Sequence, residues 1–96
     1  MFRWLNKQGV ESTSGFVLQS MDRFFYHYTE ADRVLQVNVE PLTDVTGRYR
    51  EQVYVSSLQR WQPPFGEHLI PESEQQRIRA NISAALEFMG IAHEFS

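Results

Sequence analysis

The sequence predicts a single α+β domain: a mostly antiparallel sheet of about five strands, a meander with one long C-terminal helix packed on one face. Two periodicities predict this class. Residues 34–40 alternate apolar and polar side chains, as a strand with one buried face does. Residues 72–89 carry apolar side chains at a spacing of three to four, which is typical of an amphipathic helix. Strands that come first and a helix that follows favour α+β over a parallel α/β sheet.

Four strands are expected in the first two thirds of the chain, because apolar or aromatic runs alternate there with short polar turns. The short connections predict the antiparallel meander. Pro41 is expected to end the third strand, since proline cannot donate a ladder hydrogen bond. In the fourth strand, Tyr49, Glu51 and Val53 are expected to share one face with Val55. The expected bounds of the four strands are 16–19, 24–29, 34–40 and 49–56.

The two ends of the chain are expected to differ in order. Residues 1–14 run into a polar, turn-rich sequence before Gly15 and are predicted to be a loosely ordered N-terminal extension, so that the domain spans residues 15–96. Residues 57–71 contain three prolines and a glycine, which forbid a helix, but the segment is apolar enough to wrap over the body. Residues 91–95 are expected to form a last short strand.

The helix at 72–89 is expected to begin after Pro71 and to end at Gly90, because proline suits a first turn and glycine tolerates the left-handed conformation that ends a helix. One face should pack against the sheet. That face carries the apolar residues Ile78, Ile82, Ala85, Leu86 and Met89.

Composition restricts the possible functions. The chain has 96 residues, of which 42% are hydrophobic and 14% aromatic, and this suits one domain with a thin core. Without cysteine there can be no disulfide, thiolate nucleophile or cysteine-ligated metal. A net charge of −3 makes nucleic acid an unfavourable partner, because phosphate neutralisation drives most of that affinity. No apolar run suits a signal peptide or a membrane span, so we expect a cytoplasmic protein that does not associate with membranes.

Neither catalysis nor metal binding is predicted. Lys7 is the only lysine, and the three histidines are far apart in sequence with no serine in a nucleophile turn. No two histidines have the His-x-x-x-His spacing that puts both on one helix face. No glycine-rich loop is suited to phosphate. We therefore expect no enzyme, no catalytic residue, no metal and no cofactor.

Two aromatic segments have both a functional and a structural interpretation. The run Phe24–Tyr28 could stack bases as an RNA-binding sheet does. Only Arg23 and Arg33 lie at its edges, so packing within the sheet is favoured. A second segment could be a rigid, exposed contact loop, or a strap whose tryptophan fills the gap between sheet and helix, which we favour. Its key residues are Trp61, Pro63, Pro64 and Phe65.

A longer pattern surrounds this second segment. Residues 54–64 read Tyr-Val-Ser-Ser-Leu-Gln-Arg-Trp-Gln-Pro-Pro, followed by Ile-Pro-Glu-Ser-Glu at 70–74 and by the helix. The pattern resembles a family of small predicted immunity proteins from bacterial polymorphic toxin systems. The likeness covers about residues 15–95, and its most telling part is Arg-Trp-x-Pro-Pro followed by the helix. Gln62 and Pro71 depart from it, where an acidic residue and a Ser or Thr cap are expected.

The resemblance implies an α+β protein that blocks a cognate toxin domain by tight non-covalent binding. The alternative is a stand-alone interaction or regulatory domain, which could be a homodimer formed through an exposed sheet edge; an RNA-binding sheet is a weaker third hypothesis. If the toxin is basic, acidic side chains on turns and open faces would raise the association rate. The candidate contact residues are Asp22, Glu30, Asp32, Asp44, Glu67, Glu72 and Glu74.

Overall fold

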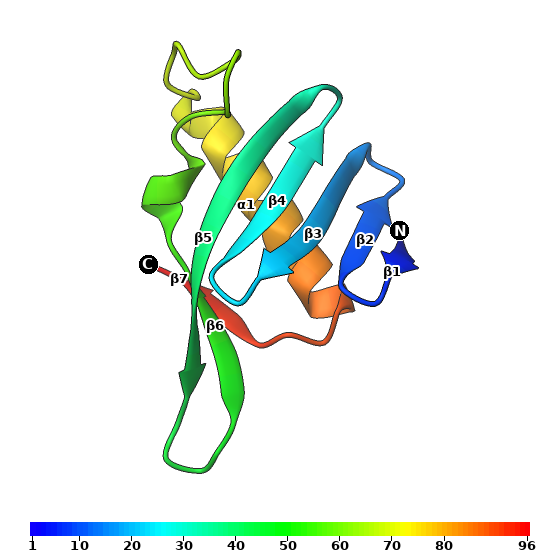
Figure 1. The fold of residues 1–96 in the computed structure, drawn as a ribbon, viewed down its shortest axis with the longest axis vertical. Helices are drawn as coiled ribbons and strands as arrows, with labels where there is room; N and C mark the ends of the chain where they lie inside the picture. Colours follow the sequence, from blue (N-terminus) through cyan, green and yellow to red (C-terminus); the bar gives the residue numbers. More distant parts are fainter.

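A seven-stranded sheet lies against one side of the single α-helix in the computed structural model, which describes residues 1–96 (Figure 1). The strands follow one another across the sheet in chain order. Strands β1 to β6 pair antiparallel, and β7 pairs parallel to β6. The helix α1 spans Glu72–Phe88. The strands are β1 (Phe2–Asn6), β2 (Gly9–Ser12), β3 (Phe16–Asp22), β4 (Phe25–Glu30), β5 (Arg33–Thr43), β6 (Tyr49–Val53) and β7 (His93–Phe95).

The expectation of about five strands was wrong, although the class is α+β. The two additional strands, β1 and β2, are formed by the residues for which a loosely ordered extension was predicted. They add to the sheet because they carry apolar side chains into the core. Val10 is fully buried, and the ring of Phe2 contacts those of Phe16 and Phe88 at centroid distances of 5.8 and 5.4 Å.

Two strand boundaries also differ from expectation. Pro41 does not end β5, which continues to Thr43. The N–H of Val39 donates to Phe24 on the β4 side, and alternation places the nitrogen of Pro41 on that same side, beyond the end of β4. No residue of β4 lies opposite Pro41 to accept a hydrogen bond, so the missing N–H of the proline does not weaken the sheet. Strand β6 ends at Val53, because a 3₁₀-helix, η1 (Val55–Leu58), takes up the residues expected to complete it.

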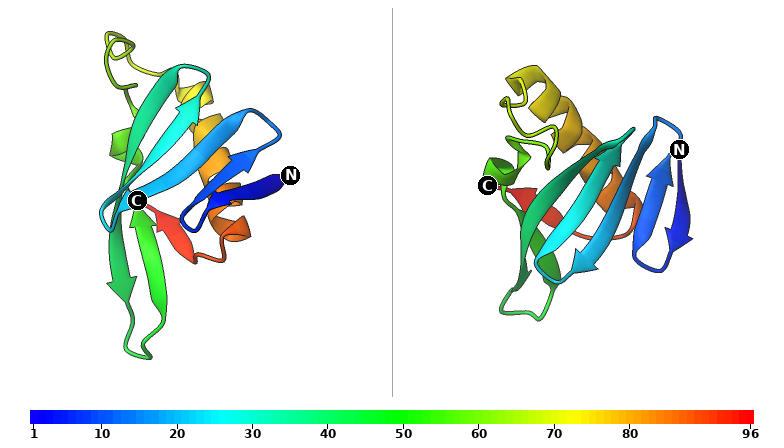
Figure 2. Two further views of the ribbon diagram at one scale, coloured as in Figure 1. Left: turned by 45° about the vertical axis from the view of Figure 1, so that its right-hand side comes forward. Right: turned by 45° about the horizontal axis from the view of Figure 1, so that its top comes forward.

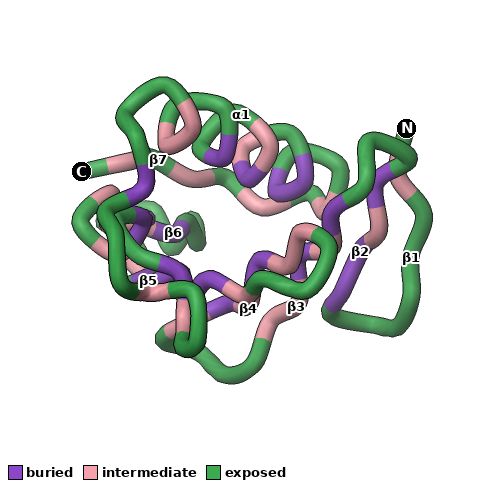
Figure 3. Tube along the Cα trace, turned by 90° about the horizontal axis from the view of Figure 1, so that it is seen from above, coloured by how far each residue is buried: buried purple, intermediate pink, exposed green.

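The core fills the space between α1 and the inner face of the sheet, as the buried segments in Figure 3 show. From α1, Ile78, Ile82, Ala85 and Leu86 are buried, while Met89 is half-buried. The sheet contributes Leu18, Tyr28, Leu35, Val37 and Val53, among others. No helix covers the outer face of the sheet (Figure 2). The helix is not both long and apolar enough to cross a membrane.

We predict that Ile82→Ala lowers the free energy of unfolding by about 2–4 kcal/mol, because it leaves a cavity under the centre of α1. Ile82 is 1% exposed. Equilibrium denaturation in urea measures the loss. Gln76→Ala, on the exposed side of the same helix, is the control and should change stability by less than about 0.5 kcal/mol. Equal stabilities of the two variants would contradict the described packing.

Candidate protein-binding site

An open groove lies at one end of the molecule, where the β4–β5 turn, residues 59–71 and the start of α1 meet (upper end of Figure 1). Two adjoining hollows share Arg33, Trp61 and Glu74 and form one surface. We call it the apical groove. Among the residues that line the groove are Glu30, Asp32, Arg33, Trp61, Pro64, Phe65, Glu67, Leu69 and Glu74.

Trp61 forms the floor of the apical groove. It is 7% exposed, and its ring stacks on that of Tyr28 with centroids 6.4 Å apart. The N–H of Gln62 donates to the carbonyl of Val34 at 2.8 Å, which fixes this segment to β5. The position of Trp61 is thus that of a residue filling the gap between sheet and helix, while Phe65, further along, remains 38% exposed.

The loop after Trp61 is held by its own hydrogen bonds. The guanidinium of Arg60 donates to the carbonyls of Gly66 and Glu67 at 2.9 and 3.1 Å. A Cβ on Gly66 would lie 2.6 Å from the carbonyl oxygen of Trp61, so only glycine fits there. The Pro63–Pro64 peptide is cis. The hydrogen bonds from Arg60 and the close approach at Gly66 hold the outward side chains of the loop in a defined arrangement.

The groove has an apolar centre and a charged rim. Phe65 and Leu69 are 38% and 60% exposed. The guanidinium of Arg33 lies over the rings of both Trp61 and Phe65, at 5.9 and 5.6 Å from their centroids. Around this centre stand three carboxylates that take part in none of the three ion pairs of the structure. These carboxylates belong to Asp32, Glu67 and Glu74.

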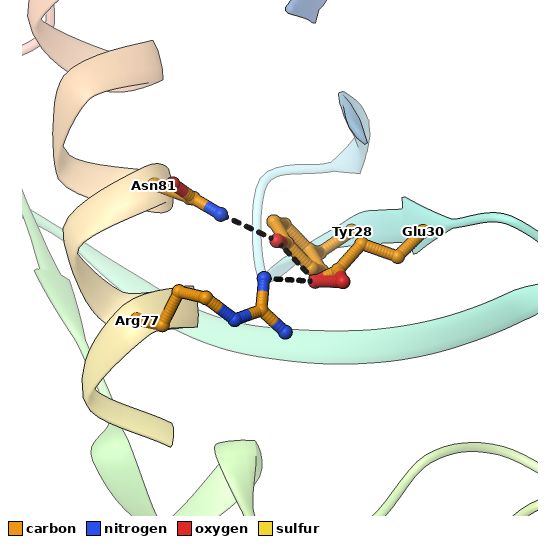
Figure 4. A network of polar contacts seen from close by, with 4 residues as sticks. All are labelled: Tyr28, Glu30, Arg77 and Asn81. Atoms are coloured by element: carbon orange, nitrogen blue, oxygen red, sulfur yellow. Dashed lines mark hydrogen bonds and ion pairs between the residues drawn. The ribbon is translucent and has the colours of Figure 1, made fainter. Parts of the chain in front are cut away.

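The fourth carboxylate of the groove, Glu30, is committed to a polar network (Figure 4). Its Oε2 accepts hydrogen bonds from the Tyr28 hydroxyl at 2.6 Å and from Arg77 at 3.0 Å, and Asn81 donates to the Tyr28 hydroxyl at 2.9 Å. Partial burial opposes ionisation of Glu30, but the bonds from Arg77 and Tyr28 outweigh it and hold its pKa below the usual value. Burial, and then the bond to Glu30, raises the pKa of Tyr28 well above its usual value. The network ties β4 to α1 beside the groove.

The remaining candidate carboxylates lie elsewhere. Glu72 lines a separate hollow beside η1. Asp22 and Asp44 sit in the turns at the opposite end of the sheet, where their Oδ1 atoms accept backbone N–H groups. Hydrogen bonds from the Thr46 hydroxyl and from the Arg48 N–H lower the pKa of Asp44. These two aspartates stabilise turns, so the structure gathers only four of the seven acidic candidates.

The aromatic run Phe24–Tyr28 is divided between the two faces of the sheet, and Phe24, in the turn before β4, is 57% exposed beneath the Arg23 guanidinium. Tyr26 and Tyr28 are 3% and 0% exposed and point into the core. Only Phe25 and His27 alternate onto the outer face of β4, where their rings are 5.6 Å apart.

Two polar contacts were missed by the sequence reasoning. The Ser83 hydroxyl lies 2.7 Å from His93 Nε2, and His93 Nδ1 lies 3.0 Å from the carbonyl of Ile91, which ties α1 to β7. A buried carboxylate, Glu51, accepts hydrogen bonds from two tyrosines. The Ser83–His93 and Tyr26–Glu51 contacts join different elements, so no local spacing reveals them, whereas Tyr49 and Glu51 are neighbours on one face of β6. No three His, Asp or Glu side chains are grouped as metal ligands.

Comparisons of this chain with protein-family models, curated proteins and solved structures find no match. The candidate site is therefore interpreted from its own residues. The resemblance to immunity proteins rests on the motif around Trp61 and on the helix that follows it.

We predict that Arg77→Gln destabilises the fold at pH 7, because Glu30 loses its cationic partner. A carboxylate with a lowered folded-state pKa contributes stability above its unfolded pKa of about 4.3, and this contribution is lost as the pH falls through the folded value. The stability difference between wild type and variant should therefore narrow below pH 4.

Urea denaturation at pH 7 and at pH 3.5 measures this difference. Arg48→Gln is the control, since it removes one positive charge from a side chain without an ion pair. A difference for Arg77→Gln that is independent of pH would show that the pairing with Glu30 contributes nothing.

Proposed function

We propose that this chain is an immunity-type protein that neutralises a cognate toxin domain by non-covalent binding, and that the apical groove is its contact site. The observation that carries the proposal is the exposed apolar centre of Phe65 and Leu69 within a rim of unpaired carboxylates. An apolar centre and a polar rim are the usual anatomy of a protein–protein interface.

Rigidity of the groove supports tight binding. Its floor belongs to the core, and its loop is held by Arg60, Gly66 and the backbone bond from Gln62 to β5. Binding to a preorganised surface costs less side-chain and loop ordering than binding to a flexible one. Inhibition of a toxin requires long residence, which a preorganised contact favours.

The charge of the groove indicates the kind of partner. Asp32, Glu67 and Glu74 make no ion pair within the chain, which carries a net charge of −3. Arg33 and Arg77 also line the groove, but the four carboxylates outnumber these two guanidinium groups. Such a surface attracts a basic protein and repels nucleic acid. A toxin domain that acts on nucleic acid would be basic and would fit this description.

The proposal predicts that a neighbouring gene encodes a large protein with a toxin-like C-terminal domain, and the direct test is co-expression of this chain with that domain. We expect that the domain alone arrests growth, that this chain restores growth, and that the two proteins purify as a stable complex. Continued arrest in the presence of the folded chain would contradict the proposal.

A second candidate function is a homodimeric interaction domain. It is favoured by β1, an edge strand whose Trp4 and Leu5 are 49% and 45% exposed. An unpaired edge of this kind can pair with a second copy. Light scattering at micromolar concentration distinguishes the two candidate functions. The homodimeric interaction domain requires a dimer that Leu5→Lys dissociates, whereas the immunity-type function requires no dimer.

We predict that reversing two rim charges, Glu67→Lys with Glu74→Lys, slows association with a basic toxin domain by roughly an order of magnitude and weakens its salt dependence. The fold should persist, because neither side chain makes an ion pair. Glu74 lies in the first turn of α1, so its reversal costs about 0.3–1 kcal/mol of helix-dipole stabilisation, as does that of Glu72 in the control below. Surface plasmon resonance at two salt concentrations measures the rate. The control, Glu72→Lys with Glu87→Lys, changes the net charge equally outside the groove, and an equal slowing would show that only the net charge matters.

We predict different effects for the two aromatic residues of the groove. Phe65→Ala should weaken toxin binding at least about tenfold with little change in melting temperature, since an exposed aromatic centre is a typical hot spot. Trp61→Ala should instead lower the stability of the free protein by about 3–5 kcal/mol, because Trp61 is buried. Titration calorimetry and thermal unfolding separate the effects. Unchanged affinity for Phe65→Ala would exclude the groove as the contact.

A further inference from the structure

A buried carboxylate without a cationic partner lies at the other end of α1. Glu51 on β6 is 6% exposed. Its Oε1 accepts a hydrogen bond from the Tyr26 hydroxyl at 2.7 Å, and its Oε2 accepts one from the Tyr49 hydroxyl at 2.6 Å. The three ion pairs of the structure join Arg3 to Glu11, Arg50 to Glu94 and Arg77 to Glu30, so none involves Glu51.

The two phenols of this cluster act on Glu51 as hydrogen-bond donors. Burial, and then the hydrogen bond to Glu51, raises the pKa of Tyr26 far above its usual value. The same causes raise the pKa of Tyr49 to about 12. Both phenols are therefore neutral donors, and each carboxylate oxygen keeps one further acceptor position. A buried charge satisfied only by neutral donors is costly compared with one that has a cationic partner.

Glu51 lies in an open pocket whose other lining residues suit an alkyl cation. Trp4 and Tyr49 line this pocket and are 49% and 52% exposed. Aromatic faces attract cations. Met89 and Ile91, half-buried in the same pocket, provide apolar surface for an alkyl chain.

The position of the pocket along α1 adds to its attraction for a cation. Met89 and Ile91 directly follow the C-terminal end of α1, which is the negative end of the helix dipole. No basic residue lies in the last turn of α1 to compensate it. Buried carboxylate, aromatic faces and helix end thus favour the same kind of ligand.

We propose that this pocket binds a cationic side chain, that of a lysine or an arginine, from a basic protein partner. The charged group would meet the Glu51 carboxylate, and the alkyl chain would lie against Met89 and Ile91. The pocket shares no residue with the apical groove, and its cation binding does not depend on the proposed toxin.

The chain itself has two cations near this pocket. Arg23 is close enough to lower the pKa of Tyr49, but its guanidinium lies over the Phe24 ring at 5.6 Å and does not line the pocket. Lys7, the only lysine of the chain, lines the pocket but forms no ion pair with Glu51. An external cation should therefore bind to the wild-type protein. Removal of Lys7 should only strengthen that binding, since one positive charge leaves the pocket.

The test is an NMR titration of the isolated full chain at constant ionic strength. The probes are the amides of acetyl-lysine and acetyl-arginine, and acetyl-norleucine amide is the uncharged control that matches lysine in shape. We expect saturable shifts of the Trp4 indole and Tyr49 ring signals with the cationic probes only. Whichever of the two cationic probes binds more tightly identifies the partner's side chain as lysine or arginine. Glu51→Gln should weaken binding at least about tenfold, because it removes the charge but keeps an acceptor.

The matched control is Glu40→Gln, because Glu40 also accepts a hydrogen bond from a tyrosine, Tyr54, but lies outside the pocket. It should bind like wild type. Should Glu51→Gln fail to fold, Trp4→Leu provides a second variant at an exposed position and should also weaken binding. The proposal would be overturned if the norleucine probe bound as well as the cationic probes. It would also be overturned if Glu51→Gln or Trp4→Leu bound the cationic probes as tightly as wild type, or if binding were seen only after Lys7→Gln.

Discussion

The packing of α1 on the sheet is the constraint on which the rest of the structure depends. It is the only long helix, and without it the inner face of all the central strands would be exposed. Burial of Ile78, Ile82 and Leu86 fixes the helix in position, and the network of Arg77 and Asn81 with β4 fixes its orientation. The apical groove forms at the beginning of α1 and the Glu51 pocket at its end. Both surfaces therefore owe their shape to this one contact.

Six of the twelve acidic side chains fall into two groups that differ in what they do. Asp22, Asp44 and Glu30 accept hydrogen bonds within the chain and stabilise turns or the helix–sheet contact. Asp32, Glu67 and Glu74 have no such partners and remain free for an interaction with another molecule. The net charge of the sequence cannot distinguish these groups, because only the fold determines which carboxylates already have a hydrogen-bond or ion-pair partner.

The sequence predicted what strong periodicity encodes. The helix and the central strands were anticipated because their apolar residues repeat regularly. Strands β1 and β2 were not, since they are only five and four residues long and gain stability only once Phe2 and Val10 reach the core. The parallel direction of β7 depends on how the chain returns after α1. Likewise, the sequence placed Tyr49 and Glu51 on one face, but Tyr26, the other tyrosine that binds Glu51, comes from β4, 25 residues away along the chain. Long-range contacts of this kind have no local signature.

Mapping the contact in the complex tests the central claim most directly. Hydrogen–deuterium exchange of this chain, free and bound to its toxin domain, reports which backbone amides the partner covers. Contact through the apical groove predicts slower exchange in the β4–β5 turn and in residues 62–69, with little change in β1. Protection confined to β1, with exchange in the loop after Trp61 unaltered, would contradict the account.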